Sequence, residues 1–244
     1  LKQEGIKLPV YVGMRNWHPL LKDVLEMMSK DGIDNVIGII LAPHQGEASW
    51  GRYQTAIQLS KESLQQEKGC KTPTIHYCEP WFVHPLFIEA MVDQLQSKAE
   101  NIPVHLRHQT KILFTAHSVP QNLSHPYVEQ LLKSCCAIAS RLDGFGDWNL
   151  VYQSRSGNPH QPWLEPDVCD VITDLAKEDY HGVLLSPVGF VCDHVEVLYD
   201  LDVEAQEIAQ KFNVRFYRAC TVNDHPSFLR MLADVVKRTL KKEH

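Results

Sequence analysis

The hydrophobic residues of this chain alternate between short apolar runs and longer stretches with helical spacing. Residues 35–42 (NVIGIILA) are apolar almost throughout, which is typical of a strand covered on both faces. Residues 19–30 instead place leucine, valine and methionine on one side of a helix. The pattern predicts strands at 8–13, 35–42, 74–78, 111–116, 148–153, 183–185 and 214–217, with helices at 19–30, 51–66, 85–97, 127–141, 167–178, after 189 and at 226–242. This alternation predicts an α/β protein whose parallel sheets are flanked by helices.

A polar, irregular stretch near residues 100–110 interrupts the alternation and predicts a domain boundary. The strand and helix units on its two sides echo each other, which indicates paired domains. We therefore expect a first domain at 1–108 plus 225–244 and a second domain at 109–224.

The segment 183–204 (VLLSPVGFVCDHVEVLYDLDVE) predicts a strand, a turn and a helix. Its helical spacing places one apolar set toward a core, namely Val195, Leu198, Leu201, Ala205, Ile208 and Phe212. Four acidic residues form a stripe beside that set: Asp193, Glu196, Asp200 and Glu204. Asp193 is expected to cap the helix, with Glu196 at the third helical position. Asp200 and Glu204 repel each other, so the stripe is either solvated or binds a cation.

Parallel strands direct their carboxyl ends to one edge of a sheet, which would bring His117, the loop 153–163 and the segment 190–196 to one rim. A neutral histidine and carboxylates there suit iron, cobalt, nickel or zinc, and the same groups accept protons. Trp163, Leu164, Phe190 and Val191 could form the wall of an apolar pocket. The alternative is structural: core aromatics and a histidine that caps a helix.

Composition narrows the classes of function. The chain has 244 residues and a net charge of −6, with scattered basic residues until the terminal KRTLKKEH, which argues against a nucleic-acid binder. It has no apolar run of membrane-spanning length and no signal-peptide pattern at its start, so we expect a cytoplasmic protein. Seven cysteines without a CxxC pair argue against a disulfide scaffold or a zinc cage and favour a reducing compartment.

Three strings in order, FTAHS (114–118), YQSRSGNPHQPWLEPD (152–167) and SPVGFVCDHVEVLYDLD (186–202), closely resemble the ferrochelatase family. Weaker likeness extends to YVGMRNWHP (11–19) and LAPHQ (41–45). The resemblance implies two Rossmann-like, chelatase-type domains. It also implies an enzyme of the last part of heme biosynthesis that inserts ferrous iron into a porphyrin held between the domains and releases two protons.

By this resemblance His117 and Glu196 match the catalytic and metal-binding pair, and Asp200 and Glu204 match an acidic line leading inward. Which member of the pair is the base and which the metal ligand stays open. The expected porphyrin contacts are Arg15, His44, Tyr152, Arg155, Trp163 and Phe190. The arginines are candidates because guanidinium pairs well with the carboxylates of a porphyrin. By resemblance, His44 favours coproporphyrin over protoporphyrin as the substrate.

The family usually begins with a further strand, turn and helices, so we expect the first domain to be incomplete and the activity to depend on that difference. Iron is expected as a substrate, with no prosthetic group and no iron–sulfur cluster, because the cysteines lack the spacing of a cluster-binding tail. Weak peripheral contact with a membrane is a further expectation, while the oligomeric state is open. Two alternatives are a non-catalytic tetrapyrrole or metal-binding module of the same fold and a cobalt or nickel chelatase of another tetrapyrrole.

Overall fold

The computed structural model describes residues 1–157, 160–178 and 180–242. The chain forms two compact units. The first contains Leu1–Leu41, Gly46–Pro80 and the described chain from Leu232 onwards; the second contains Ala42–Gln45 and Trp81–Met231.

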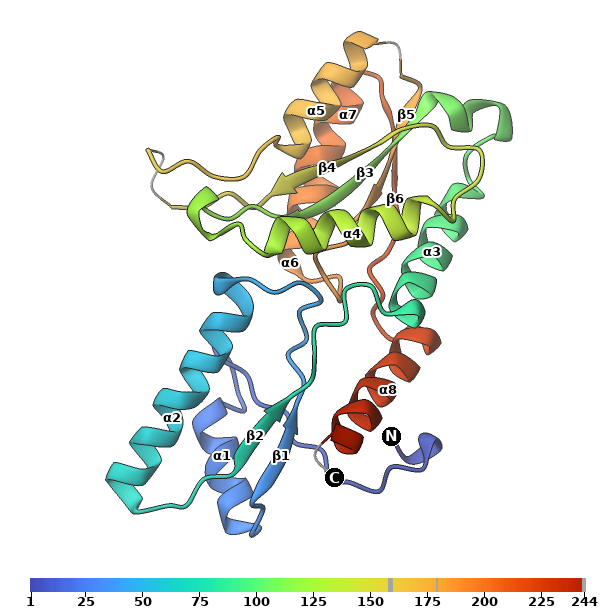
Figure 1. Cartoon of the computed structure of the whole chain (residues 1–244). Helices are drawn as coiled ribbons and strands as arrows, with labels where there is room; N and C mark the ends of the chain where they lie inside the picture. Colours follow the sequence, from blue (N-terminus) through green and yellow to red (C-terminus); the bar gives the residue numbers. More distant parts are fainter. Residues whose placement is uncertain (158–159, 179, 243–244) are drawn as a thin grey trace. The chain divides into compact units, whose positions relative to one another are not determined.

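The first unit is built on a parallel pair of strands, β1 (Asn35–Gly38) and β2 (Thr74–Tyr77), in which Asn35 lies opposite Thr74. The helices α1 (Leu21–Lys30) and α2 (Arg52–Lys68) pack beside this pair (Figure 1). Val24, Leu25, Met28 and Leu64 form the buried cluster between them. A 3-10 turn at Lys2–Glu4 and a π-helical turn at Glu47–Gly51 complete the unit, together with the C-terminal part of α8 (Pro226–Lys242).

Two predicted strands of this unit differ in the structure. Residues 8–13 form no strand, and Leu8, Val10 and Val12 are 46%, 69% and 59% exposed. The predicted strand 35–42 is limited to β1, where Asn35 is exposed and the other three residues are half-buried. The physical reason is that, among the described residues, β1 pairs with β2 alone, so no neighbouring ladder fixes residues 8–13 and no third strand covers β1.

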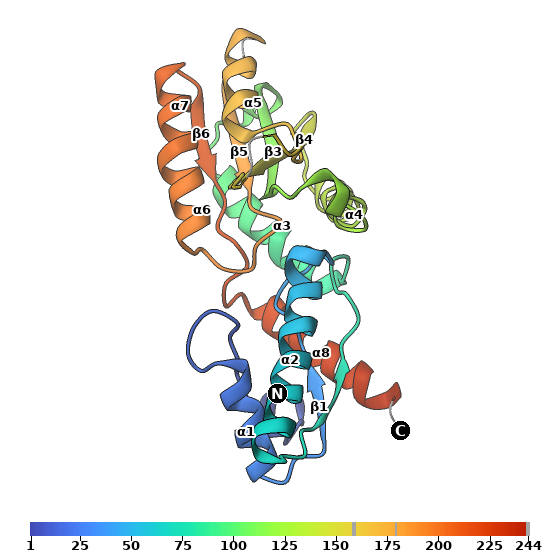
Figure 2. The ribbon, with the colours of Figure 1, turned by 90° about the vertical axis from the view of Figure 1, so that its left-hand side faces the viewer.

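The second unit has a four-stranded parallel sheet in the order β4-β3-β5-β6. Its strands are β3 (Thr110–His117), β4 (Trp148–Gln153), β5 (Gly182–Ser186) and β6 (Arg215–Arg218). On one face lie α3 (Pro85–Ala99) and α4 (Tyr127–Ala139), and on the other lie α5 (Val168–Leu175) and α7 (Gln206–Lys211) (Figure 2). The predicted α/β class with parallel sheets flanked by helices is therefore confirmed.

Shorter helical segments connect these elements. Three are 3-10 turns, at Val104–Gln109, Gln121–Leu123 and Ala176–Glu178. Between β5 and α7 the chain forms α6 (Val195–Tyr199) and then a π-helical segment, Asp200–Ala205. This continuous helical stretch carries the acidic residues singled out in the sequence.

The core of the second unit lies along β5, all of whose residues are buried, as the apolar run predicted. The helix that follows meets this core with part of the expected face, since Leu201 and Ala205 are buried and Ile208 packs against them, but its first turn differs. Val195 and Leu198 are 75% and 42% exposed, whereas Val197 and Leu201 are fully buried, followed by Ala205 and Ala209. The buried positions recur every fourth residue across α6, the π-helical segment and α7.

The boundary between the two units lies between Pro80 and Trp81 rather than at residue 108, where it was expected. Residues 81–108 cluster with the second unit. The reason is that α3 covers the sheet of that unit, packing against α4, β5 and β6. Likewise α8 begins in the second unit and continues into the first from Leu232.

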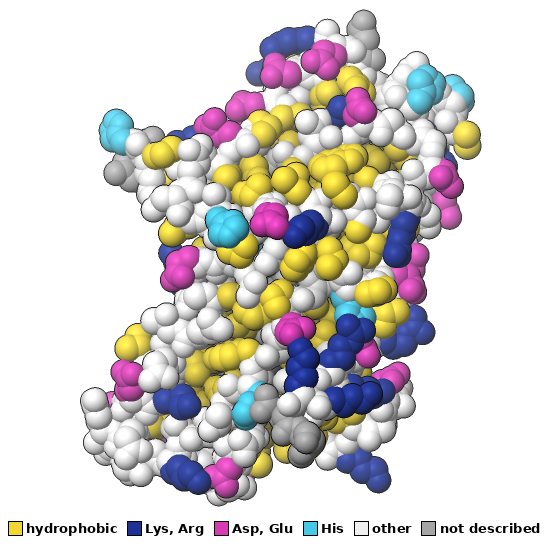
Figure 3. Space-filling model, in the orientation of Figure 1, with side chains coloured by type: hydrophobic (Ala, Val, Ile, Leu, Met, Phe, Trp, Pro, Cys, Tyr) yellow, Lys and Arg dark blue, Asp and Glu magenta, His cyan; other side chains and the backbone are white. Residues whose placement is uncertain are grey.

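Lys and Arg side chains gather over α8 in the space-filling view (Figure 3). They pair with acids of the same unit: Lys237 with Glu4, Arg238 with Asp234 and Lys242 with Glu79. The basic end of the chain is thus partly neutralised by its own fold rather than forming an open cationic face. Within the described residues, no helix combines the length and apolar character needed to cross a bilayer.

Candidate active site at the strand ends of the second unit

The site begins where β3 and β4 end side by side. His117 is the last residue of β3 and lies opposite Gln153, the last residue of β4. The backbone N–H of Ser118 then donates to the Gln153 carbonyl at 2.8 Å. This pairing explains why the two residues meet: parallel neighbours end at the same edge of the sheet.

The ring of His117 is oriented by its own backbone. Nδ1 lies 2.5 Å from the carbonyl oxygen of Ser118, and a carbonyl only accepts hydrogen bonds, so Nδ1 carries the proton. In the neutral ring the lone pair is then on Nε2, which lies 4.0 Å from Oε2 of Glu196. The two side chains are 34% and 50% exposed, so this pair is open to solvent.

Glu196 is placed by the start of α6. The helix is capped by His194, whose Nδ1 accepts from the backbone N–H of Glu196 at 3.2 Å. The prediction that Asp193 caps the helix is therefore wrong. Its carboxylate instead accepts hydrogen bonds from Arg218 and Asn223, at 2.8 Å each, which a local capping pattern could not reveal.

Asp200 begins the π-helical segment and is held by the residues at the end of β4. Ser154 Oγ donates to Asp200 Oδ2, and Gln153 Nε2 lies 3.4 Å from the same oxygen. Gln153 Nε2 also donates to the backbone carbonyl of Glu196 at 3.2 Å. Gln153 is 1% exposed and Ser154 has a left-handed φ of 61°, so a buried amide and a strained turn fix the acidic helix against the sheet.

Glu204 lies further along the same helical stretch and is exposed. Its negative charge contributes to raising the pKa of Cys169 to about 12, after the burial of that thiol and the charge of Asp167. The acidic stripe is therefore three residues, Glu196, Asp200 and Glu204, because Asp193 is paired elsewhere. Within the part of the chain that the structure describes, no group of three or more histidine, cysteine or acidic side chains converges closely enough to enclose a metal.

The aromatic candidates are largely buried. Tyr152, Phe190 and Trp163 are 4%, 8% and 9% exposed. Phe190 belongs to the main core cluster and makes an edge contact with the His194 ring at 5.0 Å between centroids. Burial raises the pKa of Tyr152 to about 12. All three side chains are buried in this structure, so their contact with a porphyrin stays a prediction.

His44 is also buried, with 1% of its surface exposed. Its Nε2 lies 2.9 Å from Ser134 Oγ, which itself donates to the Phe82 carbonyl at 2.7 Å. The hydroxyl proton is thus directed at the carbonyl, and Nε2–H of His44 donates to the hydroxyl oxygen. Burial lowers the pKa of His44 to about 3, so the ring is neutral and packs inside the second unit.

The two arginine candidates lie in different units. Arg15 belongs to the first unit, where its guanidinium carbon lies 5.4 Å from the centre of the Tyr53 ring. Arg155 belongs to the second unit and is 45% exposed, with Nη1 3.7 Å from Oε1 of Glu165. A role in binding porphyrin carboxylates stays a prediction for both.

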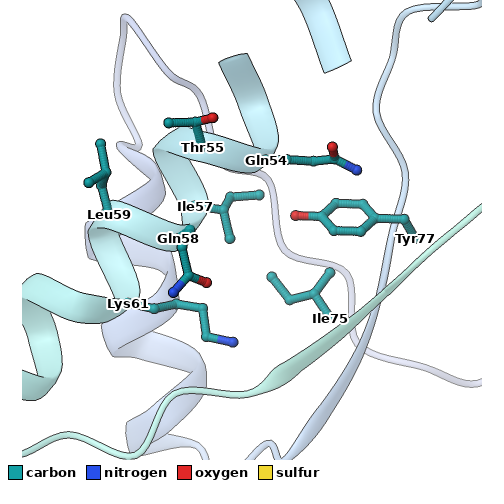
Figure 4. A pocket seen from close by; sticks show the side chains of 8 residues that line it. All are labelled: Gln54, Thr55, Ile57, Gln58, Leu59, Lys61, Ile75 and Tyr77. Atoms are coloured by element: carbon teal, nitrogen blue, oxygen red, sulfur yellow. The ribbon is translucent and has the colours of Figure 1, made fainter. Parts of the chain in front are cut away.

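A hollow of about 480 Å³ opens on the first unit, between α2 and β2 (Figure 4). Its walls contain none of the residues predicted from the sequence. The lining is mixed, with apolar and amide side chains and one lysine: Gln54, Thr55, Ile57, Gln58, Leu59, Lys61, Ile75 and Tyr77. The hollow therefore supplies neither the imidazole nor a carboxylate of the pair formed by His117 and Glu196.

Four residues that shape the site were not singled out in the sequence. Gln153 and Ser154 hold Asp200, Tyr127 donates to the His117 carbonyl at 3.3 Å, and Arg218 binds Asp193. Gln153 and Ser154 had a usable signal, since Gln153 ends a predicted strand at the same rim as His117 and Ser154 comes directly after it. Tyr127 and Arg218 had none, because they reach the site only through the packing of distant elements.

Comparison with known proteins identifies the family. The ferrochelatase family model matches residues 1–240. The coproporphyrin III ferrochelatase of Nocardia farcinica is 38% identical over 98% of this chain and 70% of its own length. The ferrochelatase of Herpetosiphon aurantiacus is 37% identical over 93% of this chain and 73% of its own length.

A solved structure of SirB from Bacillus subtilis with Fe³⁺ superposes with a TM-score of 0.67, covering 97% of this chain and 84% of SirB. Its sequence identity of 13% shows a shared fold alone. The sequence relatives carry the assignment further: this chain belongs to the ferrochelatase family.

Proposed function

We propose that this chain inserts ferrous iron into a porphyrin, in the last part of heme biosynthesis, and releases two protons. The observation that carries the proposal is the open pair of His117 and Glu196, with 4.0 Å between Nε2 and Oε2, in a chain of the ferrochelatase family. Metal insertion requires a base for the pyrrole N–H groups and a ligand that gives the metal up, and an imidazole and a carboxylate supply both.

We assign the two roles from the hydrogen bonds. Nδ1–H of His117 donates to the Ser118 carbonyl, which fixes the tautomer and leaves Nε2 as the proton acceptor. Glu196 begins a line of carboxylates that continues through Asp200 to the exposed Glu204, so it is suited to receive iron from the solvent side. In this scheme His117 takes the pyrrole proton and Glu196 hands over the metal.

The small number of converging ligands supports iron as a transient substrate. Permanent structural metal sites in proteins commonly use four protein ligands. Here the described residues bring His117 and Glu196 together without a third such ligand in a converging group, and both are partly exposed. Such a pair favours exchange of the ion, as a chelatase requires. We propose that the protein holds neither a prosthetic group nor an iron–sulfur cluster.

Porphyrin identity, contact residues and location follow as finer proposals. The name of the Nocardia farcinica relative makes coproporphyrin III the first substrate to test, with protoporphyrin IX as the comparison. The proposed contacts are those predicted from the sequence: Arg15, His44, Tyr152, Arg155, Trp163 and Phe190. A cytoplasmic location and a weak peripheral contact with a membrane remain predictions.

The test is anaerobic insertion of Fe²⁺ into each porphyrin, followed by absorbance, for the wild type, His117→Ala and Glu196→Gln. Loss of a general base or of its partner is expected to slow turnover by about a hundredfold or more. Asp93→Asn is the matched control, because Asp93 also faces a histidine, with 3.4 Å between its Oδ2 and His225 Nε2, but belongs to α3 rather than to the acidic helical stretch. Near-normal rates in His117→Ala and Glu196→Gln would contradict the assignment.

Two other outcomes separate the alternatives. Tight porphyrin binding without insertion in the wild type would indicate a non-catalytic tetrapyrrole-binding module. Faster insertion of cobalt or nickel, with a preference for another tetrapyrrole, would indicate a different chelatase.

A further inference from the structure

Arg218, the last residue of β6, joins two carboxylates that lie on either side of Glu196 and Asp200 in the sequence. Its Nε and Nη2 donate to the two oxygens of Asp202, at 2.7 and 2.6 Å. Its Nη1 donates to Oδ1 of Asp193 at 2.8 Å. One planar guanidinium therefore holds both the entry to α6 and the π-helical segment that follows it.

The bonds of this clamp are shielded from water. The side chains of Arg218, Asp193 and Asp202 are 13%, 19% and 32% exposed. Burial alone would oppose the charge of Arg218, but the hydrogen bonds and negative charge of Asp202, together with Asp193, raise the pKa of Arg218. A shielded, bidentate ion pair fixes geometry far better than an exposed one.

The loop after β6 adds to the clamp. Asn223 Nδ2 donates to Asp193 Oδ2 at 2.8 Å, and its Oδ1 accepts from the Asp193 backbone N–H at 3.1 Å. The backbone N–H of Thr221 lies 3.4 Å from Asp193 Oδ1. Asp193 is thus fully occupied in holding the turn before α6.

The acidic helix is therefore fastened at both edges of the sheet, because β4 and β6 are the two outer strands. Gln153 and Ser154 hold it from β4, and Arg218 holds it from β6. Glu196, which faces His117, lies between these attachments. A shift of either attachment would move the Glu196 carboxylate relative to the imidazole.

Arg218 also divides the carboxylates into two groups. Residues 193–204 contain five: Asp193, Glu196, Asp200, Asp202 and Glu204. The guanidinium pairs with both Asp193 and Asp202 and offsets one of their two negative charges, whereas Glu196, Asp200 and Glu204 make no ion pair with it. Without Arg218, Asp202 would be released and Asp193 would keep only its bonds to Asn223 and Thr221. The uncompensated charges would repel the neighbouring carboxylates and compete for the metal.

We propose that Arg218 is a positioning residue for metal handling, one that holds Glu196 opposite His117 and withdraws Asp193 and Asp202 from cation binding. The inference rests on the proposed function and concerns the iron step rather than the porphyrin. It therefore predicts a selective effect on the metal.

The test compares Arg218→Met and Arg218→Lys with Arg230→Met. Arg230 is a matched control in the same unit, where its Nη2 bonds Ser227 Oγ at 3.0 Å and lies 3.6 Å from Glu89 Oε1. For Arg218→Met we expect kcat/KM for Fe²⁺ to fall about ten- to a hundredfold, the scale of a displacement of about 1 Å at a reacting centre. The KM for porphyrin is expected to stay within about twofold, since the porphyrin contacts are unchanged.

Arg218→Lys is expected to recover only part of the loss, because an ammonium keeps the charge but lacks the planar fork that binds two carboxylates. If Arg218→Met does not fold, Asp202→Asn replaces it as the test variant, because it keeps the shape of the side chain. It is also expected to lower kcat/KM for Fe²⁺. Equal losses for iron and porphyrin, or values equal to those of Arg230→Met, would overturn the inference.

A second measurement separates this inference from the proposed function. If the wild type inserts iron normally and the Arg218 variants match the control, the inference fails while the function stands. If the wild type inserts no metal, the proposed function is contradicted. Titration with Co²⁺, followed by absorbance, then still tests the role of Arg218 in metal binding. Weaker Co²⁺ binding in both Arg218→Met and Glu196→Gln would support it, and unchanged affinity in Arg218→Met would refute it.

Discussion

The burial of His44 makes a quantitative prediction about pH. Its side chain is 1% exposed and burial lowers its pKa from 6.5 to about 3. The folded-state pKa lies below the unfolded one, so the stabilisation by the neutral ring is fully present above pH 6.5. It is lost as the pH falls from 6.5 toward 3, because the unfolded chain takes up a proton that the folded chain does not.

The magnitude follows from the unfolded pKa. Between pH 7 and pH 5, this single histidine should lower the free energy of unfolding by about 2 kcal/mol. The value is the same for any folded-state pKa well below 5, since the ring is then neutral in the folded protein at both pH values. His44→Gln removes the titration and keeps an N–H that can donate to Ser134.

The assay is urea denaturation of the wild type, His44→Gln and His105→Gln at pH 7 and pH 5. His44→Gln should lose about 2 kcal/mol less than the wild type between the two pH values. His105 is exposed, so His105→Gln is the control and should keep the wild-type pH dependence. NMR titration of ring-labelled histidine measures the His44 pKa directly. An ordinary pKa, or a full pH dependence in His44→Gln, would refute the burial argument and favour the predicted contact with substrate.

Three further predictions concern the frame of the site. A Cβ at Gly189 would lie 2.9 Å from the backbone and side chain of the facing residue of β3, so Gly189→Ala should lose about 1 to 3 kcal/mol in urea denaturation. Gly146→Ala, with its nearest neighbour at 3.9 Å, is the control, and equal losses would contradict the steric reason. Leu201→Ala should cost about 2 to 5 kcal/mol because Leu201 is fully buried, whereas Leu198→Ala on the exposed side should cost much less; similar costs would show that the helix phase is misassigned. Ser154→Gly should be about 1 kcal/mol more stable than Ser154→Ala, because both lose the bond to Asp200 but only glycine relieves the φ of 61°; equal thermal melts would argue against strain.

The amino-acid sequence by itself determined the alternation of strands and helices and the rim at which His117 lies. The apolar run Val183–Leu185 predicted a strand buried on both faces, and helical crossovers between such strands favour parallel pairing. Parallel pairing directs every strand end of a sheet to one edge. The position of His117 beside Gln153 follows from that rule, as does the proximity of the helix that carries Glu196.

Only the tertiary structure decided which acids and aromatics are available at that rim. Asp193 and Glu196 look alike in a local pattern, yet Asp193 is bound by Arg218, which is 25 residues away in the chain. In α6, Val197 rather than Val195 is buried in the core. Spacing along a chain is local, whereas burial and ion pairing depend on what packs against a residue from elsewhere. These long-range contacts therefore determine which carboxylates are tied up in ion pairs, as Asp193 is with Arg218, and which are exposed beside His117, as Glu196 is.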